Sequence, residues 1–327
     1  MENFRIFLLV GIIVLSGCLG QPPNGGTGSS NGVIIKQFYT DFDEVHGEEP
    51  VQFTLTVENV GEADATDVRA EIFGGIHENA GWVFDSSTPS FQSLPTDSLR
   101  RADPSNKIQG ESYDFQWIAT APTLSVDNTY TADTRVYFKY STSSVLTLKF
   151  ITNDYIRTLS TAEADKLKKT AGVTSVKTSG APLQLSATVG NSPLIVYNNV
   201  SKYALQFIIT NVGSGSVFRP TLGITGSIAL VTGQAVIPNT DLFYADMTIT
   251  TGGLDMTCPG FTLSDTNTLK GSILLSSGKT KALFCKISNV NKDDIRNTKD
   301  YVISADLNYG YFVDSSTSIK VLKTEGA

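Results

Sequence analysis

The stretch VQFTLTVENVG, from Val51 to Gly61, decides the predicted fold, because a near copy returns as YALQFIITNVG from Tyr203 to Gly213. In both copies apolar residues alternate with other residues, which is the period-two pattern of a strand with one buried face. Each copy ends in Asn-Val-Gly, which is typical of a turn. The repeat predicts two similar units built from short strands.

The order of the predicted strands is also repeated. Six or seven short strands per unit, very little helix signal and Gly-rich turns predict an all-β chain of two tandem immunoglobulin-like β-sandwiches. Each unit is expected to close with a hairpin, and Ser141 to Ser144 would form the first hairpin's turn. Tyr130 and Tyr301 begin the penultimate strands and would suit tyrosine corners. The strands expected in the first unit are 33–39, 51–61, 67–73, 112–118, 130–140 and 145–151, and those in the second are 183–189, 203–213, 217–225, 281–287, 301–311 and 318–322.

The N-terminal region predicts a signal peptide and a lipid anchor. Ile6 to Leu15 is an apolar core that rises only about 15 Å as a helix, half of the hydrocarbon thickness of a membrane. The sequence Leu-Ser-Gly-Cys that ends at Cys18 resembles the lipobox of prokaryotic lipoproteins. In that family the cysteine becomes the mature N-terminus and carries lipid, which implies lipidation of Cys18 and a membrane-anchored, extracytoplasmic location. The alternative is a buried thiol in an uncleaved anchor helix.

A flexible tether is expected directly after Cys18. Leu19 to Gly32 is rich in Gly, Pro, Ser and Asn and has too few apolar residues to form a core. Its reach is roughly 20 Å. The predicted organisation is a lipoprotein signal peptide (1–17), a lipid-anchored tether (18–32), a first β-sandwich (33–157), a linker with a short helix (158–180) and a second β-sandwich (181–323).

The linker helix is predicted from a capping box, because Ser160 is followed three positions later by Glu163. Lys166, Lys168 and Lys169 lie near its C-terminal end, where cations suit the helix dipole. We expect this helix to set the angle between the two sandwiches. The alternative function is a basic patch that touches anionic headgroups.

Composition narrows the classes of function. The chain has 327 residues, 40% of them hydrophobic, which is enough for two domains with cores of ordinary size. The formal net charge is −7, and no stretch gathers enough Lys and Arg for a phosphate-binding face. This argues against nucleic acid as a partner. The excess of acidic residues is more simply explained by a contribution to solubility.

The strand pattern resembles a known family of surface domains. A strand ending in Asn-x-Gly, then Gly-Glu or Gly-Lys before an aromatic strand, then an entry Tyr, is similar to the immunoglobulin-like CARDB type of adhesion-related domain. Such domains are common on prokaryotic, especially archaeal, surfaces. The resemblance covers most of residues 33–152 and 181–323, and it implies a fold rather than a ligand.

With Cys18 assigned to lipid, Cys258 and Cys285 remain, and an even pair outside the cytoplasm predicts a disulfide. A metal pair would lack neighbouring His and the CxxC spacing. Only two histidines occur in the chain, which excludes most His-based catalytic or zinc arrangements. No cofactor is expected.

Each of two surface features has both a functional and a structural interpretation. Asp41, Asp43 and Glu44 are candidate calcium ligands, but their loop lacks the Asp-x-Asp-x-Asp-Gly order, so a solvated loop is the alternative. Asn199 begins an Asn-Val-Ser sequon, which is a glycosylation site only in a host that glycosylates secreted proteins.

The two long insertions, 76–107 and 227–277, are the predicted binding loops, because loops on a rigid sandwich often carry function. The alternative is extra strands that cover a sheet edge. The candidate binding residues are Trp82, Phe84, Arg100, Arg101, Phe243 and Tyr244, and the second insertion also holds Met247, Met256 and Phe261.

The sequence therefore predicts a lipid-anchored cell-surface adhesion, scaffold or binding module that has no catalytic activity. Its expected partners are the membrane, through Cys18, and an envelope protein or a glycan. An alternative is an accessory lipoprotein that captures glycan or peptide for a neighbouring envelope enzyme or transporter. An envelope enzyme using carboxylates such as Asp41 and Asp43, or Asp255 and Asp265, is a weaker alternative.

Overall fold

The computed structural model describes residues 32–96, 98–190, 192–197, 201–219, 229–231, 234–238 and 240–324. The described chain is all-β, as predicted, and its antiparallel sheets pack as sandwiches. The described part holds two short α-helices, α1 (Asn153–Thr158) and α2 (Thr161–Lys168). No helix in these ranges is both long enough and apolar enough to cross a membrane.

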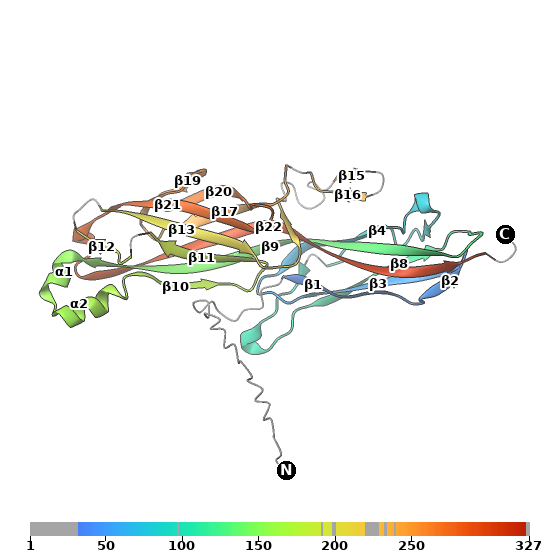
Figure 1. The fold of residues 1–327 in the computed structure, drawn as a ribbon, viewed down its shortest axis with the longest axis horizontal. Coiled ribbons are helices and arrows are strands. Elements are labelled where there is room, and N and C mark those ends of the chain that lie inside the picture. The colour runs from blue at the N-terminus through green and yellow to red at the C-terminus, as the bar shows by residue number, and fades with distance from the viewer. Residues whose placement is uncertain are drawn as a thin grey trace, which may run out of the picture.

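Two strands of 25 residues each run along the long axis of the molecule (Figure 1). They are β9 (Asn128–Thr152) and β22 (Thr298–Leu322), which pair antiparallel from Thr298 opposite Ile151 to Val321 opposite Asn128. At about 3.3 Å per residue, a strand of this length spans roughly 80 Å. The β9–β22 pair is therefore the central element of the whole fold.

The predicted closing hairpin at Ser141 to Ser144 is wrong, because β9 passes straight through these residues. Thr142 and Ser144 are buried with their hydroxyl groups paired inside the sandwich, whereas Ser143 is exposed on the other face of the strand. The buried Thr142 Oγ1 donates to the Leu183 carbonyl at 3.0 Å and lies 2.9 Å from the Tyr309 hydroxyl oxygen. Ser144 Oγ donates to Thr178 Oγ1 at 2.9 Å. The second predicted hairpin is also absent, because β22 is continuous from 298 to 322.

The large sheet contains twelve strands, and β9 and β22 lie at its centre. Its main path runs β19-β20-β17-β22-β9-β4-β6, and five further strands pair with β9, β22 or β4. Its other strands are β2 (Glu44–His46), β4 (Ala65–Gly74), β6 (Phe91–Ser93), β7 (Ser98–Leu99), β10 (Gly172–Thr178), β12 (Ile195–Val196), β14 (Ser216–Phe218), β17 (Tyr244–Thr250), β19 (Phe261–Asp265) and β20 (Thr268–Leu274).

Two four-stranded sheets cover one face of the large sheet. Even-numbered residues of β9 are buried from Ala132 to Phe150 without a break, so the same face is covered along the whole strand. The first small sheet has the order β1-β3-β8-β5 and the second β11-β13-β21-β18. Their strands are β1 (Val33–Thr40), β3 (Pro50–Asn59), β5 (Val83–Phe84), β8 (Ser112–Thr120), β11 (Leu183–Val189), β13 (Ser201–Asn211), β18 (Asp255–Thr257) and β21 (Thr280–Val290).

The predicted boundaries at 33–157 and 181–323 do not separate two sheets. The last part of β22, residues 311–322, pairs with the first part of β9, and β2 also pairs with β22 there. This part of β22 completes the first sandwich, although the sequence places it in the second. The division of the chain into two units remains a prediction drawn from the sequence repeat. The large sheet itself is common to both halves.

The stretch 158–180 is not a spacer between the halves. The predicted capping box is confirmed, because the backbone N–H of Ser160 donates to Glu163 Oε2 at 3.1 Å and Ser160 Oγ accepts the backbone N–H of Glu163. However, α1 and α2 lie at the far end of the second half (Figure 1), where Ile156 and Ala164 pack on Ile151. β10 then pairs back along β9, so the helices do not set an angle between sandwiches.

The Asn-Val-Gly repeat builds the same hydrogen-bond network in each half. In the first half the buried Asn59 Nδ2 donates to the carbonyls of Ala63 and Leu99, both at 2.9 Å. Asn59 Oδ1 accepts the Gly61 N–H at 3.2 Å and the Tyr140 hydroxyl at 3.3 Å. The asparagine thus fixes the turn and joins it to β9.

Asn211 repeats each of these contacts in the second half. Its Nδ2 donates to the carbonyls of Gly215 and Gly278, at 3.0 and 3.1 Å. Its Oδ1 accepts the Gly213 N–H at 3.1 Å and the Tyr311 hydroxyl at 2.9 Å. The tyrosines that tie strand to turn are therefore Tyr140 and Tyr311, and not the predicted corner residues.

The predicted corner residues belong to the core instead. The Tyr130 ring packs edge-on to Trp82 with centroids 5.5 Å apart, and the Tyr301 ring packs on Phe150 at the same distance.

Smaller elements complete the described chain. They are the hairpin of β15 (Ala229–Val231) and β16 (Gln234–Val236) and three 3-10 turns, η1 (Glu78–Ala80), η2 (Pro104–Asn106) and η3 (Lys292–Asp294).

Candidate functional site

Two clefts are the candidate binding sites. The first, which we call the junction cleft, lies where the first Asn-Val-Gly turn meets the middle of β9, and its volume is about 660 Å³. Its lining is polar and includes Glu62, Asp64, Arg101 and Asp103 together with four serines. It could accommodate a polar ligand, but its acidic groups are already engaged.

Three carboxylates of the junction cleft hold the surrounding backbone. Glu62 Oε2 accepts the Gly180 N–H at 2.8 Å, which joins the first turn to the segment before β11. Asp64 Oδ1 accepts the Arg101 N–H at 2.8 Å. Hydrogen bonds from Ser105 and Asn106 lower the pKa of Asp103 to about 2, so it stays ionised as the cap of η2.

The second cleft, which we call the edge cleft, lies between β18 and β19 and has a volume of about 400 Å³. Its floor is apolar, with Leu254, Met256 and Leu269 all at most 5% exposed. Leu263 of β19 stands at the rim and is 64% exposed. Asp255 is the single residue with an ionisable side chain in this lining.

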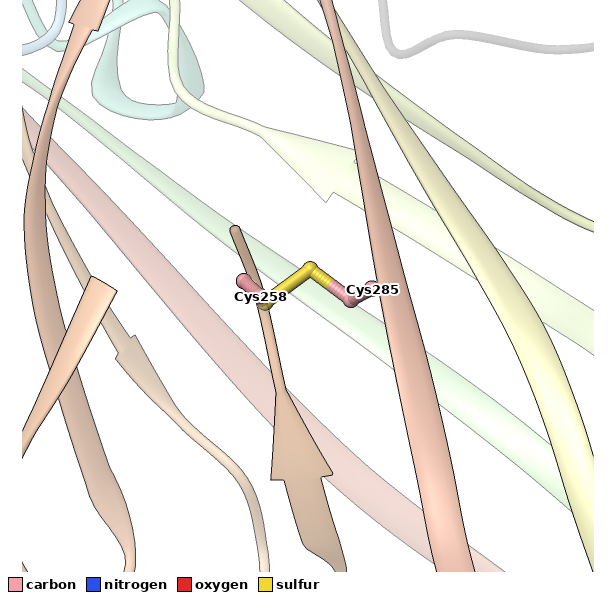
Figure 2. The surroundings of a disulfide bond; sticks show 2 residues. All are labelled: Cys258 and Cys285. Atoms are coloured by element: carbon pink, nitrogen blue, oxygen red, sulfur yellow. A yellow bond between two sulfur atoms is a disulfide. The ribbon is translucent and has the colours of Figure 1, made fainter. Parts of the chain in front are cut away.

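The predicted disulfide is confirmed (Figure 2). It lies beside the edge cleft, because Cys258 is part of the cleft lining. The sulfur atoms of Cys258 and Cys285 are 2.01 Å apart, and Cys258 follows directly after β18 while Cys285 lies within β21. The bond therefore fixes the start of the turn that leads into β19. It holds one wall of the cleft to the second small sheet.

The predicted binding residues are scattered rather than gathered, and of the six only Arg101 lines one of the two clefts. Trp82 is fully buried, with its ring 6.0 Å from that of Phe53, so its predicted place on an exposed loop is wrong. Phe84 is half-buried in β5. Arg100 is exposed, and its backbone N–H donates to Glu111 Oε2 at 3.0 Å.

Phe243 and Tyr244 lie at the start of β17 and are half-buried. The backbone N–H of Phe243 donates to the Val217 carbonyl at 2.7 Å. The guanidinium carbon of Arg219 lies 4.5 Å from the centroid of the Tyr244 ring. Both residues contact β14 or the residue that follows it, and β14 belongs to the same large sheet, so their role is structural.

The insertions mainly add strands, as the structural alternative predicted. β6 and β7 pair with β4, and β17, β20 and β19 extend the large sheet. Of the residues that line the edge cleft, Asp255, Met256, Cys258 and Phe261 were singled out from the sequence, and the others were missed. The sequence signal for Leu263 was the alternation in Phe261 to Asp265, which marks a strand but does not reveal a free edge.

The candidate calcium ligands do not form a site. Asp41 Oδ1 accepts the Gln52 N–H at 3.1 Å, and Glu44 Oε2 lies 3.4 Å from Lys320 Nζ. Within the described ranges, no three His, Cys, Asp or Glu side chains gather in a way that could hold a metal ion. The carboxylates instead fasten the loop around β2.

Several predictions lie outside the described residues. These are the signal peptide, lipidation at Cys18, the tether up to residue 31, and glycosylation at Asn199.

Comparisons with known proteins do not assign a family. No protein-family model matches the chain, and no curated protein matches it. Among solved structures, the alkylpurine DNA glycosylase AlkC of Pseudomonas fluorescens is 13% identical over 34% of this chain and 28% of that chain, with a TM-score of 0.21. The chitinase ChiA74 of Bacillus thuringiensis is 12% identical over 79% of this chain and 26% of that chain, with a TM-score of 0.19.

The MSCRAMM ACE of Enterococcus faecalis is 8% identical over 89% of this chain and 95% of that chain, with a TM-score of 0.15. The chain spans only about a quarter of the length of the glycosylase and of the chitinase. All three TM-scores are too low to support an argument about function.

Proposed function

We propose that the chain is a lipid-anchored, extracytoplasmic binding module that displays a rigid β-sandwich scaffold at the cell surface, without catalysis of its own. The observation that carries this proposal is the Cys258–Cys285 disulfide, because disulfides persist in oxidising compartments and are rare in the cytoplasm. The lipobox-like sequence before Cys18 supplies the anchor in this proposal.

The position of the first strand supports the display role. β1 begins at Val33, which pairs with Asn59 beside the Tyr140 network at the middle of the long axis. A tether of roughly 20 Å reach would hold the protein by its middle. Both ends of the long sheet would then stand clear of the membrane and be accessible to partners. The resemblance to CARDB domains is part of this proposal and agrees with the all-β fold.

The anchor is tested by expressing the full chain in a host that lipidates its secreted proteins. Metabolic labelling with a lipid precursor should mark the wild type, which should fractionate with membranes. Cys18→Ser should lose the label and appear in the soluble extracytoplasmic fraction with its disulfide intact. Recovery of an unlabelled wild-type chain from the cytosol, with both cysteines reduced, would contradict the proposal.

Capture of a peptide is a second candidate role, favoured by the apolar floor of the edge cleft. In this role the scaffold holds a segment of an envelope protein for a neighbouring enzyme or transporter. Chemical crosslinking in native membranes, followed by identification of the crosslinked partner, tests both binding roles. If no partner crosslinks at any part of the surface, neither role stands.

A further inference from the structure

Two sheet edges that have no neighbouring strand among the described residues meet at the edge cleft. β18 is the last strand of the second small sheet, and β19 is the first strand on the path of the large sheet. The chain joins them through Cys258, Pro259 and Gly260, and the disulfide fixes the first of these residues. An unpaired strand edge presents backbone N–H and C=O groups that can pair with another strand.

β19 has only part of the usual protection of an edge strand. Natural edges are shielded by charged residues, Pro, bulges or a covering loop. Phe261 to Asp265 contains neither Lys nor Pro, but its register shifts between Leu263 and the charged Asp265. The part that remains open to strand addition is therefore the beginning of the strand, up to the exposed Leu263.

The matching side of the first half is closed. There β5 is the edge of the small sheet, and the loop that follows it runs along β8. Thr88 Oγ1 accepts the Ile118 N–H at 3.0 Å, and Gln92 Nε2 donates to the Gln116 carbonyl at 2.8 Å. The second half therefore differs at the place where the edge cleft opens.

A buried hydroxyl in the edge cleft lacks a partner. Thr251 is 1% exposed and lines the cleft, and its Oγ1 has no hydrogen-bond partner among the described residues. Its backbone is satisfied, since its N–H donates to the Asn267 carbonyl at 2.8 Å and its carbonyl accepts the Leu254 N–H at 3.2 Å. The oxygen atom has almost no exposed surface, so it is an unsatisfied group of the cleft wall and not a contact point for a ligand.

The charge of the lining indicates which partner fits. Asp255 Oδ2 accepts a hydrogen bond from Asn289 Nδ2 at 2.7 Å, and within the described part of the chain no Lys or Arg forms an ion pair with this carboxylate. A ligand with a cationic group next to an apolar group would complement this lining. A neutral glycan could donate hydrogen bonds to the carboxylate, but it would leave the aliphatic floor without a matching group.

We propose that the edge cleft binds an extended peptide segment of a partner protein, which adds as a strand to β19. One apolar side chain of the peptide occupies the floor formed by Leu254, Met256 and Leu269. A Lys or Arg near it pairs with Asp255. This inference rests on the proposed binding role and names its partner, but it does not depend on the lipid anchor.

The probe for this site is a phage-displayed library of random linear peptides, selected on the full chain. We expect enrichment of sequences in which apolar residues alternate and a Lys or Arg lies close by. A fluorescein-labelled copy of an enriched peptide is then titrated by fluorescence anisotropy. Leu263→Lys should weaken its binding at least about tenfold, because a charge on the edge blocks strand addition.

A matched control separates the cleft from general surface apolarity. Phe284→Lys changes a residue of the same half that is 61% exposed and lies on β21 outside the lining. It should leave the affinity unchanged. Asp255→Asn should weaken binding of the enriched peptide. It should not change binding of a version of that peptide in which the Lys or Arg is replaced by Gln. Near-ultraviolet circular dichroism checks that each variant is folded.

Several results would overturn the proposal. They are failure to enrich any peptide above a no-protein control, equal affinity of the wild type and Leu263→Lys, and equal loss with Phe284→Lys. A wild-type dimer that becomes a monomer in Leu263→Lys, seen by sedimentation equilibrium, would assign the edge to a second copy and overturn peptide capture. If peptide binding fails while the membrane crosslink to a partner persists, the cleft proposal alone falls.

Discussion

Single asparagines determine how the turns are joined to the long strands. Asn59 is fully buried, and its side chain makes four hydrogen bonds, two as donor and two as acceptor. Asn59→Ala would leave the carbonyls of Ala63 and Leu99 without this donor. We expect it to lower the free energy of unfolding by about 3 kcal/mol, measured by urea denaturation.

The exposed Asn308 of β22 is the control for this substitution. Asn308→Ala should change the free energy of unfolding by less than about 0.5 kcal/mol. Equal effects of the two substitutions would show that the buried network does not stabilise the fold.

Buried tyrosines at the centre of the molecule give it a dependence on alkaline pH. Burial raises the pKa of Tyr309 above its ordinary value of 10.0, and the pKa values of Tyr140 and Tyr311 are raised for the same reason. A raised folded pKa means that the unfolded chain releases the proton first. The stabilisation is therefore complete below about pH 10 and is lost as the pH rises further.

We expect the free energy of unfolding, measured by urea denaturation between pH 8 and pH 11, to fall above about pH 10. Tyr309→Phe should reduce the steepness of this fall, although it also removes the contacts with Thr142 and Leu183 and so lowers stability at all pH values. An unchanged slope in this variant would contradict the assignment.

At the scale of elements, the disulfide covalently links the residue after β18 to β21. It closes a loop with a sequence separation of 27 between buried cysteines. Replacing both residues, Cys258→Ala with Cys285→Ala, should lower the free energy of unfolding by about 3–4 kcal/mol in the chain-entropy account. The wild type measured in dithiothreitol should approach the double variant, and a reductant effect on the double variant itself would point to another cause.

The elements also show how far the sequence could predict the fold. Alternation predicted most strands, the capping box predicted α2, and the repeated Asn-Val-Gly predicted two equivalent turns. The run from Ser141 to Ser144 misled because hydroxyl residues favour turns, and only partners distant in sequence, Leu183 and Tyr309, keep Thr142 inside a strand. Long-range pairing overrode the local preference.

The candidate site was harder to predict than the strands. Trp82 was a candidate because tryptophan is enriched in binding hot spots. In the structure it fills the core between Phe53 and Tyr130. The edge cleft depends on which strands lack a neighbour, and strand order is not encoded in the alternation of a single strand. No pattern in the sequence marks Thr251, because only the folded structure shows that its hydroxyl lacks a hydrogen-bond partner among the described residues.

At the scale of the whole molecule, the two long strands make each half depend on the other. Lys139 lies opposite Gly310, and the network tyrosines Tyr140 and Tyr311 follow these two residues by one position each. The repeat is therefore arranged as an approximate twofold about this pair. Each long strand contributes one part of its length to each half.

This arrangement predicts the outcome of a truncation after Gly310. The truncated chain keeps all of residues 33–157, so two independent domains would leave the first one folded. In the structure it loses the buried Val313, Ile319 and Val321, which pair with or lie beside the first part of β9, and it leaves that edge of β9 without its partner. We expect the first half to lose its packing.

The measurement is direct because the only two tryptophans of the chain, Trp82 and Trp117, both lie in the first half and are fully buried. Their emission in the truncated chain should shift to longer wavelength, toward that of the chain in concentrated urea. Removal of residues 325–327 is the control and should leave the emission native. Native emission after truncation at Gly310 would show that the first half folds alone, and the shared strands would then join two domains that are each complete without the other.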